Sequence, residues 1–552
     1  MFKTKKIISM VWALILIIFT FSACTGEGGD TSTPDKSTSS EVDKSDDTAA
    51  DSEESFAVSY PIKTDEKITL TYWIPMPGPN ANYVSNWGET EIYQEIMKRT
   101  GVDIEFIHPA ADQVREQYNL LVASGELPDI LCGNLWAQFF NGGASAGVEE
   151  GIFVDLTDYV PKYAPDYYKL ITSDPYVYRT TTDDEGRISA FYRILSDYQY
   201  PNWRLMVRND ILDEVGMDIP LLISDYEALF EKIKALGVTP YCLSRNGYEQ
   251  LFMQVFDVSS GMYKDENGTI KYGQIQPEFK EYLELMNRWY SKGYIKNDFL
   301  ATNENDLRAG FDSKKIAMIA ESTDLILTRA KLQGYEFSAL PYPRMEEGQQ
   351  LHFQKESSPY NRAGTSEWVV TTNCKYPEVA VQFLNYLYTE EGSMLANYGI
   401  EGKSYEIVDG KPQFTDYMLN NPDIDGTAAQ NMLKLHAAPK LADPDQICNP
   451  NVVRDEESLS LRTLWADDPN VDGEYVLPNF SFSLDDSSAI SEIMTEVNTY
   501  VDEMVLKFIT GATPLSEFDA FVKQVEAMGI QEAVEIYQNA YNRMMQKELP
   551  QQ

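Results

Sequence analysis

The sequence predicts an α/β protein with two lobes. Between Ile68 and Gly133, apolar patterns typical of strands alternate with patterns typical of helices, and the connections are short. This order predicts a parallel sheet covered by helices, because parallel strands need crossover connections. Helices and short strands continue through the rest of the 552 residues. Because this length exceeds what one sheet and one core accommodate, we expect a second lobe.

The first sheet is expected to contain three strands with two helices between them. Thr90 is the expected N-terminal cap of the first helix, and Gly101 suits its C-terminal end. Ligands of such sheets bind beyond the C-terminal ends of the strands. The strands are predicted at 68–74, 102–107 and 127–133, and the helices at 91–100 and around 114–122.

Later segments have equally clear patterns. The stretches "IAMIA" (316–320) and "SEWVVTT" (366–372) predict strands. The stretch "PEVAVQFLNYLYTEEG" predicts a helix that begins at Pro377, because proline suits a first helical turn. From 489 to 545 the pattern predicts helices, interrupted at "TGATP" and at Gly529. Asn267 and Gly268 predict a hairpin turn in "KDENGTIKYG".

The N-terminus has the order of residues found in a secretory signal. Three lysines precede an apolar run at 7–23, which ends in the small residues Ser22 and Ala23. Small residues followed directly by Cys24 resemble a bacterial lipobox, in which the cysteine is acylated and becomes the mature N-terminus. Cys24 is therefore the expected lipid attachment point, and 1–23 the signal peptide. An uncleaved anchor is the alternative, but the run is shorter than the ~20 residues that comfortably cross a bilayer.

An acidic tether is expected after the signal. Residues 25–56 are polar and acidic with almost nothing apolar, so we assign 24–65 to the acylated cysteine and a disordered linker. The formal net charge is −41, and loss of the three signal lysines makes it −44. Such a surface repels phosphate backbones and anionic lipids, so nucleic acid is not an expected partner and membrane attachment needs the covalent anchor.

Cysteine and histidine spacing argues against metal and hydrolase chemistry. No CxxC occurs, and the cysteines after Cys24 lie beside apolar residues, so buried thiols are expected, although spacing cannot exclude a disulfide. Three scattered histidines without HExxH make a zinc site or a recognisable Ser-His-Asp hydrolase improbable. The cysteines concerned are Cys132, Cys242, Cys374 and Cys448.

Several stretches occur in an order that resembles a known family. They include "KRTGVDIEF", "LLVASGELPDI", "GIFVDLTDYVPKYAPD", "VRNDILDEVGMDIP", "YSKGYIKNDF" and "YGIEGKSYEIVDGKPQFTD". With the lipobox, they resemble family-one extracellular solute-binding proteins over nearly all of 66–546, in particular the large lipoproteins of Firmicutes that serve carbohydrate importers. The resemblance implies a type II periplasmic-binding-protein-like fold, with two α/β lobes, hinge strands and a ligand cleft between the lobes.

The resemblance also implies lobe boundaries and the absence of a cofactor. Many relatives carry a calcium loop after the helix that follows "VRNDILDEVG", but here the oxygen ligands for calcium are missing, so we expect no metal. Hinges are expected near 193–200, 321–324 and 399–403. Lobe one is then 66–195 plus 323–400, and lobe two is 196–322 plus 401–552.

A sugar site needs flat aromatic surfaces and planar polar groups. The chain is 12% aromatic, with 35 tyrosines and 8 tryptophans, which suits such a site and also suits ordinary cores. The candidate ligand-binding residues lie after predicted strands or beside the implied hinges. They are Trp73, Asn134, Trp136, Asp197, Trp203, Glu321, Trp368, Glu401 and Tyr405.

Five of these candidates also have a structural alternative. The tryptophans at 73, 203 and 368 fit core packing, and Asp197 fits a solvated loop. Glu401 fits a local backbone cap. Arg204 and Arg362 are further candidates if the sugar is acidic, because a few arginines could override the acidic surface.

The resemblance implies a monomeric, lipid-anchored receptor on the extracellular face of the membrane. It would capture a carbohydrate by lobe closure and deliver it to an ABC permease. The expected ligand is an oligosaccharide, and sugars that contain uronic acid belong to this class. A peptide is an alternative ligand. A surface glycoside hydrolase or lyase is the alternative; it would need two paired carboxylates, but 86 acidic residues make such pairs uninformative. A sensor that signals by the same closure is a third possibility.

Overall fold

The computed structural model describes residues 58–134, 139–197, 201, 203–243, 250–354, 358–363, 366–424, 426–435, 437–443 and 456–550. The predictions for Cys24, Trp136 and Cys448, and the part of the tether before residue 58, therefore lie outside the described residues. The last part of the predicted tether, 58–65, is described and is not a free linker, because Ile62 is buried and its N–H donates to the carbonyl of Thr100 at 2.8 Å. Residues Ser55–Gln552 form one compact unit. None of the described helices is long and apolar enough to cross a membrane.

The first sheet has the strand order β2-β1-β3-β12-β4. As predicted, β1 pairs in parallel with β2 and with β3. The predicted strand in "SEWVVTT" is β12, which joins the same sheet antiparallel to β3 and β4 although it comes more than two hundred residues later. The strands are β1 Thr69–Trp73, β2 Asp103–Ile107, β3 Ile130–Asn134, β4 Phe191–Tyr192 and β12 Glu367–Val370.

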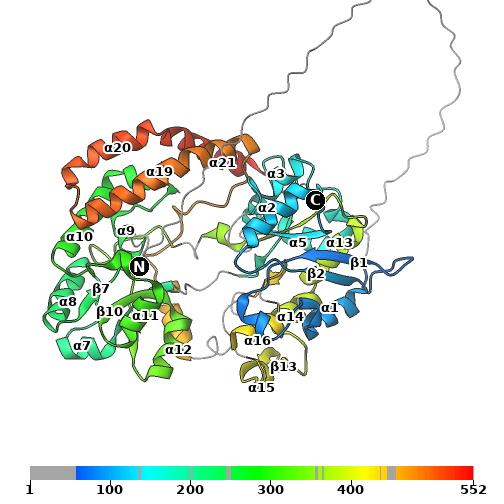
Figure 1. Ribbon diagram of the computed structural model, residues 1–552, viewed down its shortest axis with the longest axis horizontal. Coiled ribbons are helices and arrows are strands. Elements are labelled where there is room, and N and C mark those ends of the chain that lie inside the picture. The colour runs from blue at the N-terminus through cyan, green and yellow to red at the C-terminus, as the bar shows by residue number, and fades with distance from the viewer. Residues whose placement is uncertain are drawn as a thin grey trace, which may run out of the picture. The chain divides into compact units, whose positions relative to one another are not determined.

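Helices beside the first sheet confirm the predicted alternation (Figure 1). Helix α1 begins after Thr90 and ends at Gly101, whose φ of 76° is the left-handed conformation that favours glycine. The helix predicted from Pro377 is α13. The helices of this part are α1 Glu91–Thr100, α2 Val114–Ser124, α3 Gly143–Glu149, α4 Val160–Tyr163, α5 Pro165–Thr172, α6 Pro175–Thr181, α13 Pro377–Asn385, α14 Glu390–Tyr398, α15 Asp416–Leu419 and α16 Gly426–Met432.

The second sheet has the order β11-β6-β10-β7. Strand β10 is the predicted "IAMIA" strand, and it is buried almost throughout. The elements are β6 Trp203–Arg208, β7 Thr239–Tyr241, β10 Ile316–Ser322, β11 Phe337–Ala339, α7 Asn209–Val215, α8 Ile223–Ala235, α9 Gln250–Met253, α10 Pro277–Ser291, α11 Glu304–Asp312, α12 Thr323–Gln333 and α18 Glu456–Ala466.

Three small pairings complete the strands. The predicted turn at Asn267-Gly268 joins β8 to β9, and Gly268 has the positive φ of 76° that such a turn requires. Short strands β5 and β15 pair in parallel, and β13 pairs with β14. Their bounds are β5 Ile194–Leu195, β8 Met262–Lys264, β9 Ile270–Tyr272, β13 Tyr405–Val408, β14 Lys411–Phe414 and β15 Leu441–Ala442.

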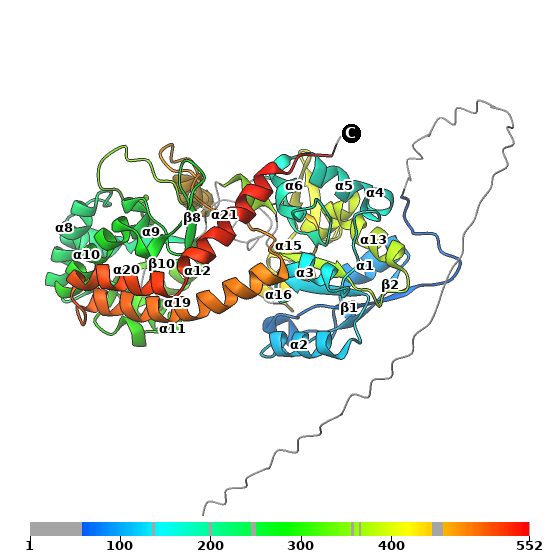
Figure 2. The same cartoon turned by 90° about the horizontal axis from the view of Figure 1, so that it is seen from above.

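The C-terminal part is helical, with the predicted interruptions. It contains α19 Leu484–Thr510, α20 Phe518–Ala527 and α21 Ile530–Gln546. Helices α19 and α21 pack against each other (Figure 2). Most of the buried side chains of α19 lie in the core of the second sheet, whereas Leu484 at its start packs against the core of the first sheet. These helices therefore connect the two cores.

The two cores divide the chain differently from the predicted lobes. The first contains buried side chains from 62–194 and 363–438, and the second contains side chains from 205–353 and 475–533. The segment 323–353 was assigned to lobe one, but β11 pairs with β6 and keeps it at the second sheet. The described chain therefore passes from one core to the other between Ile194 and Leu205, between Phe353 and Ala363, and between Ala442 and Leu461. The predicted hinges stay predictions.

The described cysteines confirm one further expectation. Cys132, Cys242 and Cys374 are buried thiols. Burial raises the pKa of the Cys374 thiol to about 12, so this group stays protonated at neutral pH. These thiols pack as small apolar groups.

Candidate functional site

A cavity of about 260 Å³ lies beside the first sheet, just below the ~300–1,000 Å³ typical of small-molecule sites. One side is formed by the start of β12, by β4, by α6 and by the first turn of α3. The other side is formed by the segment 478–482, which precedes α19, and by Tyr537 of α21. The first residue of β12 is the pairing partner of Asn134, the last residue of β3, so the cavity lies near the C-terminal end of β3.

Glu367 is the most unusual residue of this cavity. It is only 6% exposed, and its Oε1 has no hydrogen-bond partner among the described residues. Burial raises the pKa of the carboxyl group to about 7, opposed by a hydrogen bond from the backbone N–H of Ala144. Gly133 on β3 makes room for it, because a Cβ there would lie 3.3 Å from Oε1. The cavity thus presents a carboxyl group that titrates near neutral pH.

Aromatic rings form the opposite wall. The ring centroids of Phe480 and Phe482 are 5.9 Å apart, and that of Tyr537 lies 5.0 Å from Phe482 and 6.0 Å from Phe480. All three side chains are half-buried. Such rings offer apolar faces to a ligand in the cavity.

Hydroxyl groups complete the lining. Ser145 is nearly buried, and its Oγ lies 3.2 Å from that of Ser189. Thr180 and Tyr192 also line the cavity. Burial and the charge of Glu367 both raise the pKa of Tyr192, so its hydroxyl stays protonated. One carboxyl group, several hydroxyls and an aromatic wall can bind a polyhydroxylated molecule with apolar faces.

Two predicted tryptophans are core residues. Trp73 is 3% exposed and packs edge-on against Tyr118, with ring centroids 5.6 Å apart. Trp368 is fully buried next to Glu367 in β12. Asn134 is placed only by its backbone, which lies beside Glu367, and Trp136 lies outside the described residues. Trp73 and Trp368 are therefore not among the described residues that line the cavity.

The candidates near the first two implied hinges lie on strands of the second sheet or in the chain segment that leads to it. Asp197 is exposed. Trp203 is 49% exposed at the start of β6, opposite Ser322 of β10. Glu321 is 2% exposed; its Oε2 accepts from Arg308 Nε at 2.6 Å, and its Oε1 accepts from the backbone of Ser322 at 2.8 Å. Glu321 therefore has protein partners in this structure.

The remaining candidates have local contacts as well. Tyr405 is buried in a small cluster with β14, and Glu401 is exposed beside it. The guanidinium of Arg204 lies over the ring of Tyr342, 4.9 Å from its centroid. Arg362 donates to Asp174 at 2.8 Å and to the carbonyl of Leu195. None of the predicted ligand-binding residues is among the described residues that line the cavity, and their role in ligand binding stays a prediction.

Sequence reasoning missed Glu367 and the aromatic wall. A local signal existed in both places. Glu367 interrupts the apolar strand "SEWVV", and "NFSFS" (479–483) alternates aromatic and small polar residues. Neither pattern shows that the two segments, more than a hundred residues apart, meet at one cavity.

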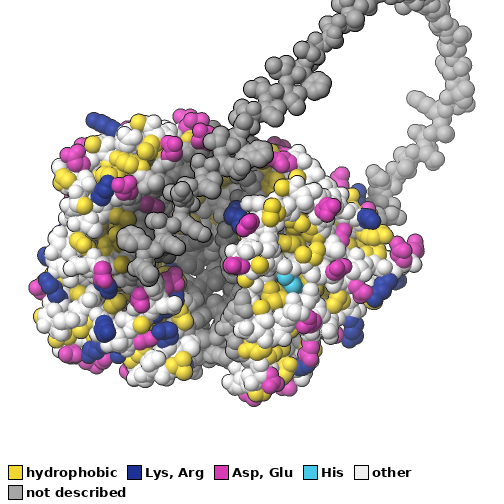
Figure 3. Space-filling view, in the orientation of Figure 1, with side chains coloured by type: hydrophobic (Ala, Val, Ile, Leu, Met, Phe, Trp, Pro, Cys, Tyr) yellow, Lys and Arg dark blue, Asp and Glu magenta, His cyan; other side chains and the backbone are white. Residues whose placement is uncertain are grey.

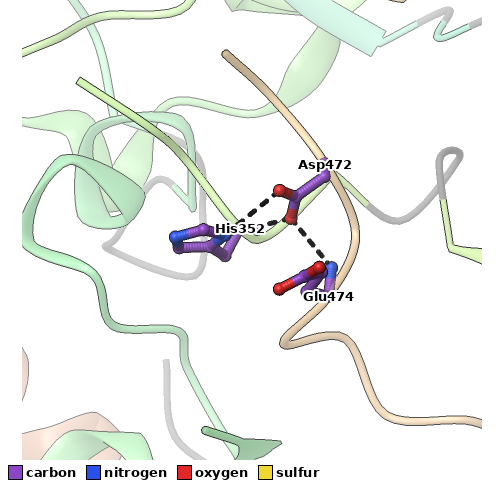
Figure 4. A group of neighbouring side chains, drawn as sticks. All are labelled: His352, Asp472 and Glu474. Carbon is purple, nitrogen blue, oxygen red and sulfur yellow. Dashed lines mark hydrogen bonds and ion pairs between the residues drawn. The ribbon is translucent and has the colours of Figure 1, made fainter. Parts of the chain in front are cut away.

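A second group of side chains could hold a metal ion. His352, Asp472 and Glu474 offer ligand atoms that lie within 4.8 Å of one another (Figure 4). In this structure His352 Nδ1 lies 3.0 Å from Asp472 Oδ1, and the backbone N–H of Glu474 donates to the same oxygen at 3.0 Å. The His352 ring also stacks on Tyr475, with centroids 4.3 Å apart. These contacts join the segments 351–354 and 470–475.

Charged side chains do not mark a site on the face of the molecule seen in Figure 3. Acidic side chains are spread over the face seen in Figure 3 rather than gathered in one patch. Exposed acidic side chains also pair with lysine, as Glu503 does with Lys507 at 2.5 Å. Exposed pairs of this kind stabilise little. The cavity around Glu367 is therefore the better candidate.

Comparison with known proteins identifies relatives that bind carbohydrates. The fructooligosaccharide ABC transporter substrate-binding protein FusA of Streptococcus pneumoniae serotype 4 (strain ATCC BAA-334 / TIGR4) is 21% identical over 523 residues, covering 88% of this chain and 92% of FusA. The polygalacturonan/rhamnogalacturonan-binding protein YtcQ of Bacillus subtilis (strain 168) is 21% identical over 476 residues, covering 82% of this chain and 88% of YtcQ.

Solved structures share the fold. FusA of S. pneumoniae in complex with kestose matches with a TM-score of 0.69 and 18% identity, covering 86% of this chain and 99% of that structure. The alginate-binding protein AlgQ2 without calcium ion matches with a TM-score of 0.66 and 20% identity, covering 87% and 99%. These neighbours confirm the predicted type II solute-binding fold.

The family model for bacterial extracellular solute-binding proteins matches residues 86–394, which is more than half of the chain. The family and these relatives are binding proteins rather than enzymes. The chain therefore belongs to the bacterial extracellular solute-binding protein family.

Proposed function

We propose that this protein is the receptor of a carbohydrate ABC importer, anchored by a lipid on Cys24 to the extracellular face of the membrane. It captures an oligosaccharide as a monomer and delivers it to the permease. The cavity beside Glu367 carries the proposal, because it combines an aromatic wall with hydroxyl and carboxyl groups. The names of FusA and YtcQ, which refer to oligosaccharide and polysaccharide ligands, support the same class of cargo.

In this proposal the two walls of the cavity bind different parts of a sugar. The C–H faces of a sugar ring stack on Phe480 and Phe482, and its hydroxyl groups donate to Glu367 Oε1 and exchange hydrogen bonds with Ser145. The affinity comes from removing these groups from water together. No pair of carboxyl groups lines the cavity among the described residues, so nothing there resembles the acid and nucleophile of a glycoside hydrolase.

The elements that carry the two walls of the cavity support closure of the protein on its ligand. Glu367 and Tyr192 belong to the first sheet, whereas α19 and α21 also pack in the core of the second. The far end of α21 returns to the first core, where Lys547 Nζ donates to the carbonyl groups of Arg179 and Thr182 at 2.7 Å each. A ligand held between the walls favours the conformation that brings them together, and this conformation is the one presented to the permease.

Thermal unfolding of residues 55–552 with a panel of oligosaccharides, monosaccharides and peptides tests the proposal. A ligand at a hundred times its Kd adds about 2.7 kcal/mol to the free energy of unfolding. We expect one class of oligosaccharide to raise Tm. The Phe480→Ala/Phe482→Ala variant should lose that shift, and Tyr417→Ala, which removes an exposed ring from α15, should keep it.

Two outcomes would contradict the proposal. Stabilisation by a peptide and by no sugar would assign a different cargo. A sugar shift of equal size in the wild type and in the Phe480→Ala/Phe482→Ala variant would place the binding site away from this cavity.

A further inference from the structure

We propose that this cavity selects uncharged sugars and rejects uronic acids, and that Glu367 is the residue that discriminates between them. The inference rests on the proposed function and names the class of ligand within it. The two curated relatives leave this question open, since one is named for fructooligosaccharide and the other for polygalacturonan and rhamnogalacturonan.

The inference is based on the charges of the residues that line the cavity. Among the described residues that line the cavity there is no lysine, arginine or histidine. The ionisable groups there are Glu367 and the phenols of Tyr192 and Tyr537. A carboxylate ligand is normally bound by arginine or lysine, or by several N–H donors. An acidic sugar would instead meet a buried acid, because in the first turn of α3 the N–H of Gly143 already donates to the carbonyl of Phe140 and that of Ala144 to Glu367.

Among the residues that the structure describes, no cation compensates the charge of Glu367. Its one described donor is the backbone N–H of Ala144 on α3. From α2 and β4, Tyr118 and Tyr192 interact with its charge, and burial keeps both phenols protonated. Asp183, whose charge acts on Tyr192, is a further acid, and it is paired with Arg187 at 2.6 Å. A second carboxylate inside the cavity would therefore raise the pKa of Glu367 further.

Neutral sugars have the complementary chemistry. A sugar hydroxyl group can donate a hydrogen bond to Glu367 Oε1, which has no partner among the described residues. This bond replaces the hydrogen bond to water that is lost when the carboxyl group is buried. This bond favours the ionised carboxyl group, so binding of a neutral sugar releases a proton. Its affinity should rise about tenfold per pH unit up to about pH 7 and then level off. A uronate requires Glu367 to be protonated, so its affinity should fall as the pH rises.

Calorimetric titration with neutral and acidic trisaccharides tests the inference. The neutral panel contains fructo-, galacto-, xylo-, manno- and malto-trisaccharides, and the acidic panel contains trigalacturonate and alginate trimers. Methyl-esterified trigalacturonate is the neutral counterpart of trigalacturonate. We expect a neutral sugar to bind at least about tenfold more tightly than any uronate at pH 7.5.

Two variants separate the charge from the shape of the site. Glu367→Gln keeps the size of the side chain and removes its charge. It should therefore flatten the pH dependence of sugar affinity and reduce the difference in affinity between neutral and acidic sugars. Glu535→Gln removes an exposed charge from α21 and should change neither the pH dependence of affinity nor the difference between neutral and acidic sugars. Thermal unfolding of Glu367→Gln verifies that the variant is folded.

The possible outcomes are distinct. A uronate that binds as tightly as the best neutral sugar would overturn the inference and leave the proposed function intact. A neutral preference that is unchanged in Glu367→Gln would also overturn it. If no sugar of either kind binds, the proposed function itself fails.

Discussion

At Glu367 a carboxyl group interrupts the apolar strand "SEWVV". In a solvated strand this residue would face water, but the register of β12 against β3 and β4 places it inside the protein. Burying an acid without full hydrogen bonding is unfavourable, and proteins retain such groups mainly where they serve a function. Glu367 therefore combines a cost in stability with a group that can contact a ligand.

The Glu367→Gln substitution should alter how stability depends on pH. Because the pKa is raised from 4.5 to about 7 on folding, the native state binds more protons than the unfolded chain between these values. Wild-type stability should therefore fall as the pH rises from 4.5 to 7, by roughly 3 kcal/mol in total. Glu367→Gln should lack this fall, as measured by urea unfolding of both proteins at pH 5 and pH 8. An identical pH dependence in the two proteins would refute the assigned burial.

At the scale of elements, local patterns predicted most of the first sheet. Strand β1, helix α1 and the glycine that ends it follow from alternation, helical spacing and backbone conformation within about thirty residues. The same holds for β10, for α13 and for the turn at Gly268. Each of these signals lies within the element itself.

Pairing between distant segments could not be predicted in the same way. Strand β12 was expected, but its place beside β3 depends on contacts across more than two hundred residues. The predicted lobe boundaries also depended on contacts between distant segments. The pairing of β11 with β6 keeps 323–353 at the second sheet. The cavity was missed for this reason too, since its two walls meet only in the folded chain.

Two glycines that end helices give a matched test of local structure. Gly101 after α1 and Gly125 after α2 have φ values of 76° and 70°. Alanine at either position should cost about 1 kcal/mol from the backbone alone. At Gly101 a Cβ would also lie 2.9 Å from Cβ of Pro61, whereas at Gly125 it meets nothing within 4 Å. We expect Gly101→Ala to destabilise more than Gly125→Ala in urea unfolding, and equal losses would contradict this packing.

For the whole molecule, the arrangement of the cores suits a receptor that responds to its ligand. The described chain passes between the cores more than once, and α19 packs in both cores while α21 packs in the second. Arg543 near the end of α21 pairs with Asp184, and its Nη2 lies 3.5 Å from Asp486 of α19. Motion of one core relative to the other would therefore be transmitted to the aromatic wall of the cavity.

Small-angle X-ray scattering of residues 55–552 tests capture by closure most directly. The measurement compares the free protein with the protein saturated by the sugar that raises Tm most. We predict a smaller radius of gyration with the sugar, and no change for the Phe480→Ala/Phe482→Ala variant under the same conditions. Saturation of the wild-type protein without any change in its scattering would contradict closure as the response to ligand.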